Sequence, residues 1–214
     1  MQELIETEAE GARADASRRR FLAVPAAAGL AAFLAACGSS SDPQTAKQNA
    51  SAAQSPKGGE DLQIVNYALT LEHLEADFYD RVVEAGMFSG AEAGVFRLIQ
   101  SNEHEHVAAL QALARSLGGP VAERPQTQFP LGSRHAVLTL ASTLENTGAA
   151  AYLGQFDAIE NRGVLAQLVA IHSIEGRHAA KLALMLGDDF SPDGATGSPL
   201  DMGEVMDAVQ PFIV

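Results

Sequence analysis

The stretch TLEHLEADFY, residues 70–79, has a counterpart 73 residues later in TLENTGAAAY, residues 143–152. Both begin with Thr-Leu-Glu, and both place a Tyr seven residues after that Glu. Each stretch also precedes a Glu-x-x-His motif further along the chain. The repeated residues are, in chain order, Glu72, Tyr79, Glu103, His106, Glu145, Tyr152, Glu175 and His178. Agreement in residue type, order and spacing predicts two similar helical hairpins.

These polar residues interrupt otherwise apolar helical faces. Apolar residues recur in alternating steps of three and four, which is typical of a helix that packs on a core. The pattern extends over segments 61–86, 89–117, 133–160 and 162–187. In the second segment, for example, Ile99 precedes Glu103, and Leu110 follows His106 on the same face. The sequence therefore predicts four helices with six ionisable groups on their packed faces.

The lengths of the connections predict an all-α four-helix bundle. Short turns near residues 87–89 and 161–162 would close two hairpins, and residues 118–132, rich in Gly and Pro, would form one long crossover. At about 1.5 Å per residue, the six ionisable groups would all lie about 20 to 27 Å from the hairpin ends. We therefore expect them to meet in one layer of the bundle.

Four carboxylates in one apolar layer repel one another, and each buried charge without a partner costs several kcal/mol. Two divalent cations would cancel the four negative charges, and two neutral imidazoles would add ligands without adding charge. A site rich in carboxylates and free of sulfur favours iron or manganese over tetrahedral zinc. We expect two divalent metal ions, with iron as the first choice and manganese as the alternative.

With these motifs, residues 61–187 resemble the ferritin-like di-iron carboxylate superfamily, and most closely its exported members with a twin-arginine leader. The resemblance implies a ferritin-like bundle in which Glu103 and Glu175 bridge two metal ions. It further implies that Glu72 and His106 complete one metal position, and that Glu145 and His178 complete the other. The tyrosines at 79 and 152 would orient these ligands or take part in redox chemistry.

Several of these positions have alternative interpretations. Glu75 is a rival to Glu72, because it lies on a neighbouring apolar stripe of the same segment; the spacing to Tyr favours Glu72. His172 is either an extra ligand or a hydrogen-bonded core histidine, and we favour the second. Tyr79 and Tyr152 can also be simple core residues.

The beginning of the chain predicts export. Residues 17–22, SRRRFL, are typical of a twin-arginine signal, and the apolar run to residue 36 is too short to span a bilayer. The run ends in LAAC, residues 34–37, which resembles a lipoprotein processing site with Cys37 as the lipidated residue. We expect an exported, extracytoplasmic protein, anchored through Cys37 to a bacterial cell membrane.

Composition divides the chain into four parts. These are a signal peptide over 1–37, a flexible linker over 38–59, the bundle over 60–187, and a tail over 188–214 with a short helix near 202–209. Residues 38–59 contain no large apolar residue and cannot form a core. The net charge is −13, which argues against nucleic acid as a partner.

The expected function is a membrane-tethered dinuclear metal protein of the ferroxidase or peroxidase type that oxidises ferrous iron, reduces peroxide or dioxygen, or does both. One alternative is dismutation of peroxide by a manganese centre, as in manganese catalases. Another is a non-catalytic, stress-associated envelope protein that binds metal. The sequence is compatible with a homodimer, and it does not specify the oligomeric state.

Overall fold

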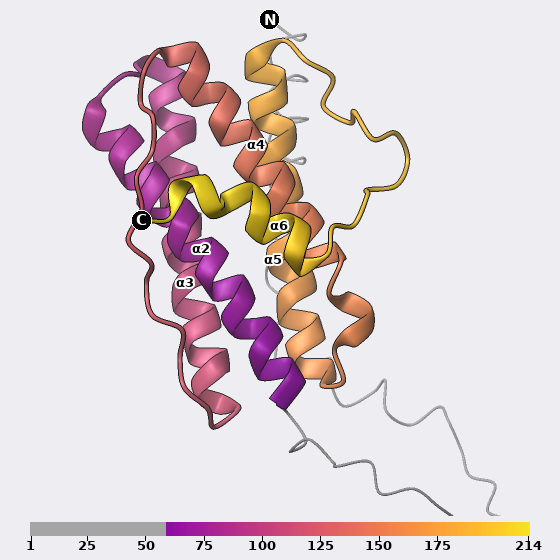
Figure 1. Ribbon diagram of the computed structural model, residues 1–214. Helices are drawn as coiled ribbons and strands as arrows, with labels where there is room; N and C mark the ends of the chain where they lie inside the picture. The colour runs from indigo at the N-terminus through magenta and orange to yellow at the C-terminus, as the bar shows by residue number, and fades with distance from the viewer. Residues whose placement is uncertain (1–58) are drawn as a thin grey trace, which may run out of the picture. The chain divides into compact units, whose positions relative to one another are not determined.

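The computed structural model describes residues 59–214, in which there are five α-helices and no β-strand. Four long helices form two hairpins, and a short helix follows them (Figure 1). The helices are α2 (Gly59–Ala85), α3 (Gly90–Ser116), α4 (Arg134–Leu153), α5 (Arg162–Leu186) and α6 (Met202–Val209). The all-α fold class is therefore confirmed. The expected leader, Cys37 and nearly all of the expected linker lie outside the described residues.

Local sequence accounts for the ends of the helices. The side chain of Asn161 accepts hydrogen bonds from the first backbone N–H groups of α5, and Ser133 does the same for α4. Gly187 ends α5 with φ of 86°, a left-handed conformation that glycine adopts without steric cost. Helix α6 begins with a capping box between Asp201 and Glu204.

The core consists of two apolar clusters with a polar layer between them. One cluster is built around Phe78, Phe96 and Leu182, and the other around Leu69 and Leu110. Along α3 and α5, the repeated Glu and His residues lie between the parts of the helix that join each cluster. The apolar clusters therefore hold the helices together on both sides of the ionisable groups.

The third long helix is shorter than predicted. It ends at Leu153 rather than near residue 160, and a 3₁₀ turn, Phe156–Ala158, lies in the link to α5. The backbone of Leu200 approaches this point and donates a hydrogen bond to the carbonyl of Ala150. A Cβ atom on Gly154 would collide with the carbonyl oxygen of Leu200. The chain turns away here because the C-terminal segment packs against it.

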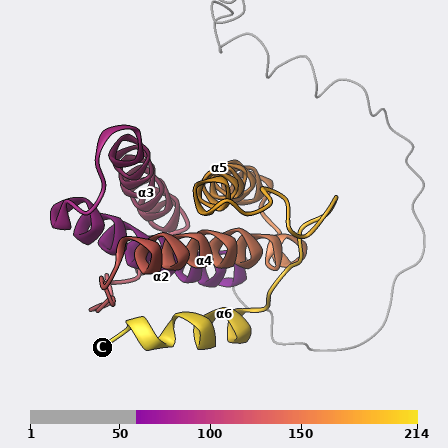
Figure 2. The ribbon, with the colours of Figure 1, turned by 90° about the horizontal axis from the view of Figure 1, so that it is seen from above.

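The long crossover, residues 117–133, runs along the bundle from the end of α3 to the start of α4 (Figure 1). Asn66 on α2 holds it by donating to the carbonyl of Pro120 and accepting from the N–H of Ala122. Further on, Thr127 forms an isolated antiparallel bridge with Ile213. The expected short helix at 202–209 is also present, and it covers the side of α2 and α4 opposite to α3 and α5 (Figure 2).

Candidate metal centre

The structure brings the six predicted ligand residues together inside the bundle. All four glutamates are fully buried, and the two histidines are 6–7 % exposed. Every long helix contributes to the group, which consists of Glu72 on α2, Glu103 and His106 on α3, Glu145 on α4, and Glu175 and His178 on α5.

The six residues form two overlapping clusters. The first cluster contains Glu72, Glu103, His106 and Glu175, and the second cluster contains Glu103, Glu145, Glu175 and His178. Within each cluster, one possible ligand atom from every residue lies within 4.8 Å of the others. Two donor atoms that are each about 2.1 Å from the same ion lie at most about 4 Å apart. A small movement of the side chains toward one another would therefore let all four donor atoms contact one ion. Glu103 and Glu175 belong to both clusters.

Unpaired oxygens show that these side chains fit metal ions. Oε1 of Glu103 and both carboxylate oxygens of Glu175 are enclosed without a hydrogen bond. Nδ1 of His178 lies 3.1 Å from the first of these atoms, and Nδ1 of His106 lies 3.0 Å from Oε1 of Glu175, but neither contact has hydrogen-bond geometry. A buried polar atom without a partner is costly. A cation between the shared glutamates would satisfy these atoms.

The two tyrosines link the repeats crosswise. The hydroxyl of Tyr79, on α2, donates a hydrogen bond to Glu145 on α4. The hydroxyl of Tyr152, on α4, donates to Glu72 on α2. Burial, together with the charge of the bonded carboxylate, raises the pKa of each tyrosine well above its usual range. Both hydroxyls therefore stay protonated and fix one oxygen of each glutamate.

Protons take the place of cations in the metal-free chain. Burial alone would lower the pKa of His178, but its contacts with Glu103 and Glu145 outweigh burial and raise the pKa to about 9. Glu103, Glu175 and Glu72 likewise raise the pKa of His106. Each of the two histidines thus carries a proton that a metal ion would displace.

The two shared carboxyls also hold protons more tightly than usual. Burial raises the pKa of Glu103 to about 7, although its contacts with the two histidines lower it. Burial raises the pKa of Glu175 well above its usual range, and the charge of Glu103 raises it further. The group therefore binds protons strongly without metal, as expected for carboxylates forced into one apolar layer.

The structure also shows where the residues with alternative interpretations lie. Glu72 belongs to a cluster, whereas Glu75 is buried beside the group but belongs to neither cluster. Nδ1 of His172 lies 3.1 Å from the carbonyl oxygen of Ala149, and His172 belongs to neither cluster. It is a partly buried, hydrogen-bonded histidine.

Sequence reasoning did not identify Asn102. Its Nδ2 atom lies 3.3 Å from Nε2 of His178, on the side of the ring away from the carboxylates. Because Asn102 is on α3 and His178 is on α5 of the other hairpin, no spacing along the chain reveals this contact.

Comparison with known families agrees with the geometry. The profile of the family described as "Ferritin-like domain" matches residues 60–188, which include all six residues of the group. The chain belongs to this ferritin-like domain family. A search of curated proteins found no match. Among solved structures, the protein is similar to a hypothetical protein from Methanococcus jannaschii, with a TM-score of 0.51 and 15 % identity over 80 % of this chain and 98 % of that one.

In this ferritin-like domain, the buried carboxylates and histidines form a site that can hold metal ions. The histidines come from α3 and α5, and their rings are 6.2 Å apart, centre to centre. These two helices lie on the side of the bundle that α6 leaves uncovered (Figure 2). Of the six residues, only the two histidines have any exposed surface, and both come from these helices. Within residues 59–214, no helix has both the length and the hydropathy needed to cross a bilayer.

Proposed function

We propose that this ferritin-like domain binds two ions of iron, or of manganese, and uses them to oxidise ferrous iron, to reduce peroxide or dioxygen, or to do both. The observation that supports this most directly is that two four-residue clusters share Glu103 and Glu175. Sharing two carboxylates is a way to hold two cations close together while burying only four negative charges. Two divalent ions would neutralise these charges and replace the protons that the metal-free chain carries.

The set of donor atoms supports iron or manganese. Six oxygen- or nitrogen-bearing side chains and no sulfur suit these ions, which accept mixed carboxylate and imidazole ligands. Such an ion pair, when bound, supplies electrons to peroxide or dioxygen and receives them from a reductant. The protein fixes how many ligands each ion has and how dry the surroundings are.

The residues around the ions would have separate tasks. Glu103 and Glu175 would hold both ions, with Glu72 and His106 on the first and Glu145 and His178 on the second. Tyr79 and Tyr152 would each hold one carboxylate oxygen, so that the other stays directed at the ion. The apolar clusters on both sides exclude water, which strengthens every charge interaction in the layer.

The proposed localisation of the protein is based on the sequence alone. The residues SRRRFL at 17–22 support export through a twin-arginine pathway, and Cys37 supports a lipid anchor. Because that pathway carries folded proteins, the ions would be inserted before export. If Cys37 carries the anchor, the variant Cys37→Ala should move the protein from the membrane fraction to the soluble fraction while its metal content stays the same.

The function is tested with the full chain purified in detergent. Metal content is measured first, and the metal-free protein is then loaded with ferrous iron without oxygen and mixed with dioxygen or with peroxide in a stopped-flow instrument. Two irons per chain and a rapid absorbance change on mixing support the proposal. A purified protein with two manganese ions that releases oxygen from peroxide would instead be a dismutase. Bound metal without turnover would indicate a non-catalytic metal protein.

A matched pair of variants keeps this test specific. Glu103→Gln removes a shared carboxylate, and Glu105→Gln changes an exposed glutamate two residues later on the same helix. The first variant should lose metal and turnover. The second should behave as the natural chain, because its side chain points to solvent.

A further inference from the structure

Glu75 and Gly148 occupy equivalent positions in the two repeats, because each lies three residues after the Glu that opens its repeat. The crossed tyrosine hydrogen bonds relate the repeats by an approximate two-fold axis. Glu75 on α2 and Gly148 on α4 therefore face each other across this axis. One repeat has a carboxyl group at this position, and the other has no side chain at all.

The carboxyl group of Glu75 occupies the space that a side chain on Gly148 would take. A Cβ atom built on Gly148 would lie 3.0 Å from Oε1 and 3.5 Å from Oε2 of Glu75. The same Cβ atom would lie 3.4 Å from Oε2 of Glu175. Glu75 is only 3 % exposed. The missing side chain on α4 thus makes room for one more buried carboxylate beside the shared glutamate.

The carboxyl group of Glu75 lies against α4 at Gly148, about one helical turn after Glu145, a ligand residue of the second cluster. Oε1 of Glu175 lies 3.0 Å from Nδ1 of His106, which belongs to the first cluster. Of the two oxygens of Glu175, Oε2 is the one that lies against α4, 3.4 Å from a Cβ atom built on Gly148. Because the two oxygens of a carboxylate point apart, Oε2 is directed at α4, the helix that carries Glu145.

Asn102 adds a second difference at the same cluster. Its amide lies 3.3 Å from Nε2 of His178. The equivalent residue of the second repeat is Ile174, which cannot form a hydrogen bond with His106. An ion at Nδ1 of His178 leaves the proton on Nε2, and the amide oxygen of Asn102 can accept it after the amide turns over. A partner of this kind fixes the ring of a metal ligand.

We infer that the two ion positions are not equivalent, and that Glu75 is an additional ligand of the position formed by Glu145 and His178. This inference rests on the proposed dinuclear centre. The position with Glu75 has one more carboxylate, and its histidine is held by Asn102. It therefore binds its ion first and more tightly, whereas the position formed by Glu72 and His106 fills second.

The order of filling is measured by adding Co²⁺ to the metal-free full chain and recording the visible absorption and the heat of binding. The natural chain should show two separate steps. The variant His178→Ala should lose the tight step, and His106→Ala should lose the weak step. This pair identifies which step belongs to which cluster.

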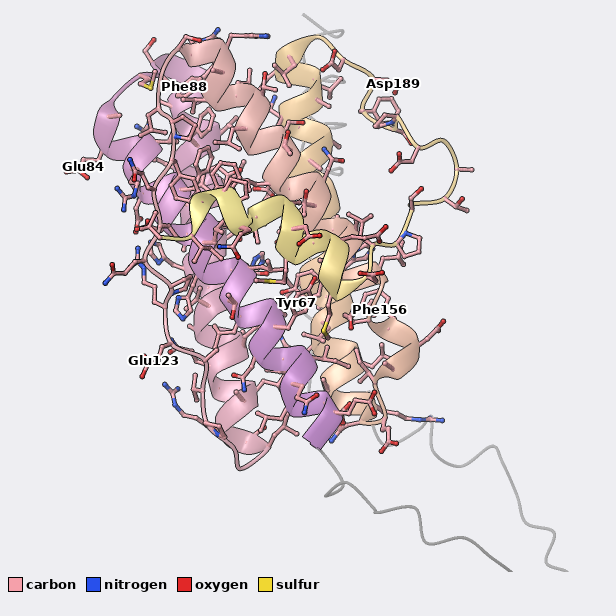
Figure 3. The ribbon with its side chains drawn as sticks, viewed as in Figure 1. Tyr67, Glu84, Phe88, Glu123, Phe156 and Asp189 are labelled. Carbon is pink, nitrogen blue, oxygen red and sulfur yellow. The ribbon has the colours of Figure 1, made fainter. Side chains whose placement is uncertain are left out.

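Glu75→Gln keeps the size of the side chain and removes its charge. The dissociation constant of the tight step should rise about 10- to 100-fold, the usual range for residues that support a metal site, and the weak step should stay unchanged. The matched control is Glu84→Gln, because Glu84 is on the same helix but projects away from the bundle (Figure 3). The control should leave both steps as they are.

A double variant covers the case in which Glu75→Gln does not fold. Glu75→Gly combined with Gly148→Glu moves the carboxyl group to the other helix, and the two steps should then approach each other in affinity. Two equal steps in the natural chain, or an unchanged tight step in Glu75→Gln, would overturn the inference and leave the dinuclear centre intact. No Co²⁺ binding to the natural chain would overturn the proposed function as well.

Discussion

The hydroxyl of Tyr79 lies 2.5 Å from Oε1 of Glu145, so a residue of the first hairpin fixes a carboxylate of the second. Nδ1 of His178 lies 3.2 Å from the other oxygen of the same carboxylate. The tyrosine therefore decides which oxygen of Glu145 is free to meet the histidine and a cation. Equivalent contacts join Tyr152, Glu72 and His106.

Tyr79→Phe should weaken the binding of one ion and leave the fold intact. Without the hydroxyl, Glu145 can rotate, and loss of such a partner typically costs about 10- to 100-fold in metal affinity. Competition with a coloured chelator measures the effect. Tyr152→Phe should give a similar loss at the other position, whereas unchanged affinity in both variants would show that the tyrosines only fill the core.

Without metal, the free energy of unfolding should fall as the pH rises from about 4.5 to 9. Glu103 has its pKa raised from 4.5 to about 7, and His178 has its pKa raised from 6.5 to about 9. In this range the folded chain binds more protons than the unfolded chain, so stability decreases with pH. The part due to His178 is fully present below pH 6.5 and is lost as the pH passes 9.

Urea unfolding with a chelator at pH 5, 7 and 9 measures this dependence. The variant His178→Gln should decrease less steeply between pH 6.5 and 9, because the contribution of His178 is absent. With metal bound, the ligands are deprotonated in the folded chain as well. Low pH weakens metal binding, because protons compete with the ions. The decrease in stability with rising pH should therefore disappear. A metal-free stability that rises from pH 5 to 9 would contradict the assignment.

Sequence spacing predicted the bundle and the meeting of the six residues, because these follow from helical periodicity and from two short turns. It failed where packing between distant segments decides the structure. The end of α4 at Leu153 depends on the approach of Leu200, and the contact of Asn102 with His178 joins two hairpins. The relation between Glu75 and Gly148 was within reach, since the same 73-residue offset that aligns Glu72 with Glu145 also aligns this pair.

Glu175→Gln should raise the stability of the metal-free protein and abolish its stabilisation by metal. The carboxyl is fully buried, neither of its oxygens has a hydrogen bond, and its pKa is raised well above the usual range. An amide of the same shape avoids the cost of either burying that charge or taking up a proton to remove it. Thermal unfolding with and without Fe²⁺ or Mn²⁺ measures both effects, because a ligand that binds only the folded state raises its melting temperature.

The natural chain provides the reference for that experiment, and Glu105→Gln provides the control, because Glu105 is exposed on α3. Both should melt at a higher temperature with metal than without it. If Glu175→Gln kept the full metal effect, Glu175 would not be a ligand. If it were less stable than the natural chain without metal, the buried carboxyl would have a favourable partner that outweighs its burial.

Gly154→Ala should destabilise the protein by detaching the C-terminal segment. A Cβ atom there would lie 2.0 Å from the carbonyl oxygen of Leu200, and because that atom belongs to the backbone, the whole segment has to move. A loss of about 1 to 3 kcal/mol is typical of overpacking. Gly176→Ala is the control, since nothing lies within 4 Å of its added methyl group, and it should stabilise α5 by about 0.5 to 1 kcal/mol. Urea unfolding gives both free energies, and faster hydrogen exchange in α6 of the first variant alone would locate the damage; equal behaviour of the two variants would show that Leu200 does not limit α4.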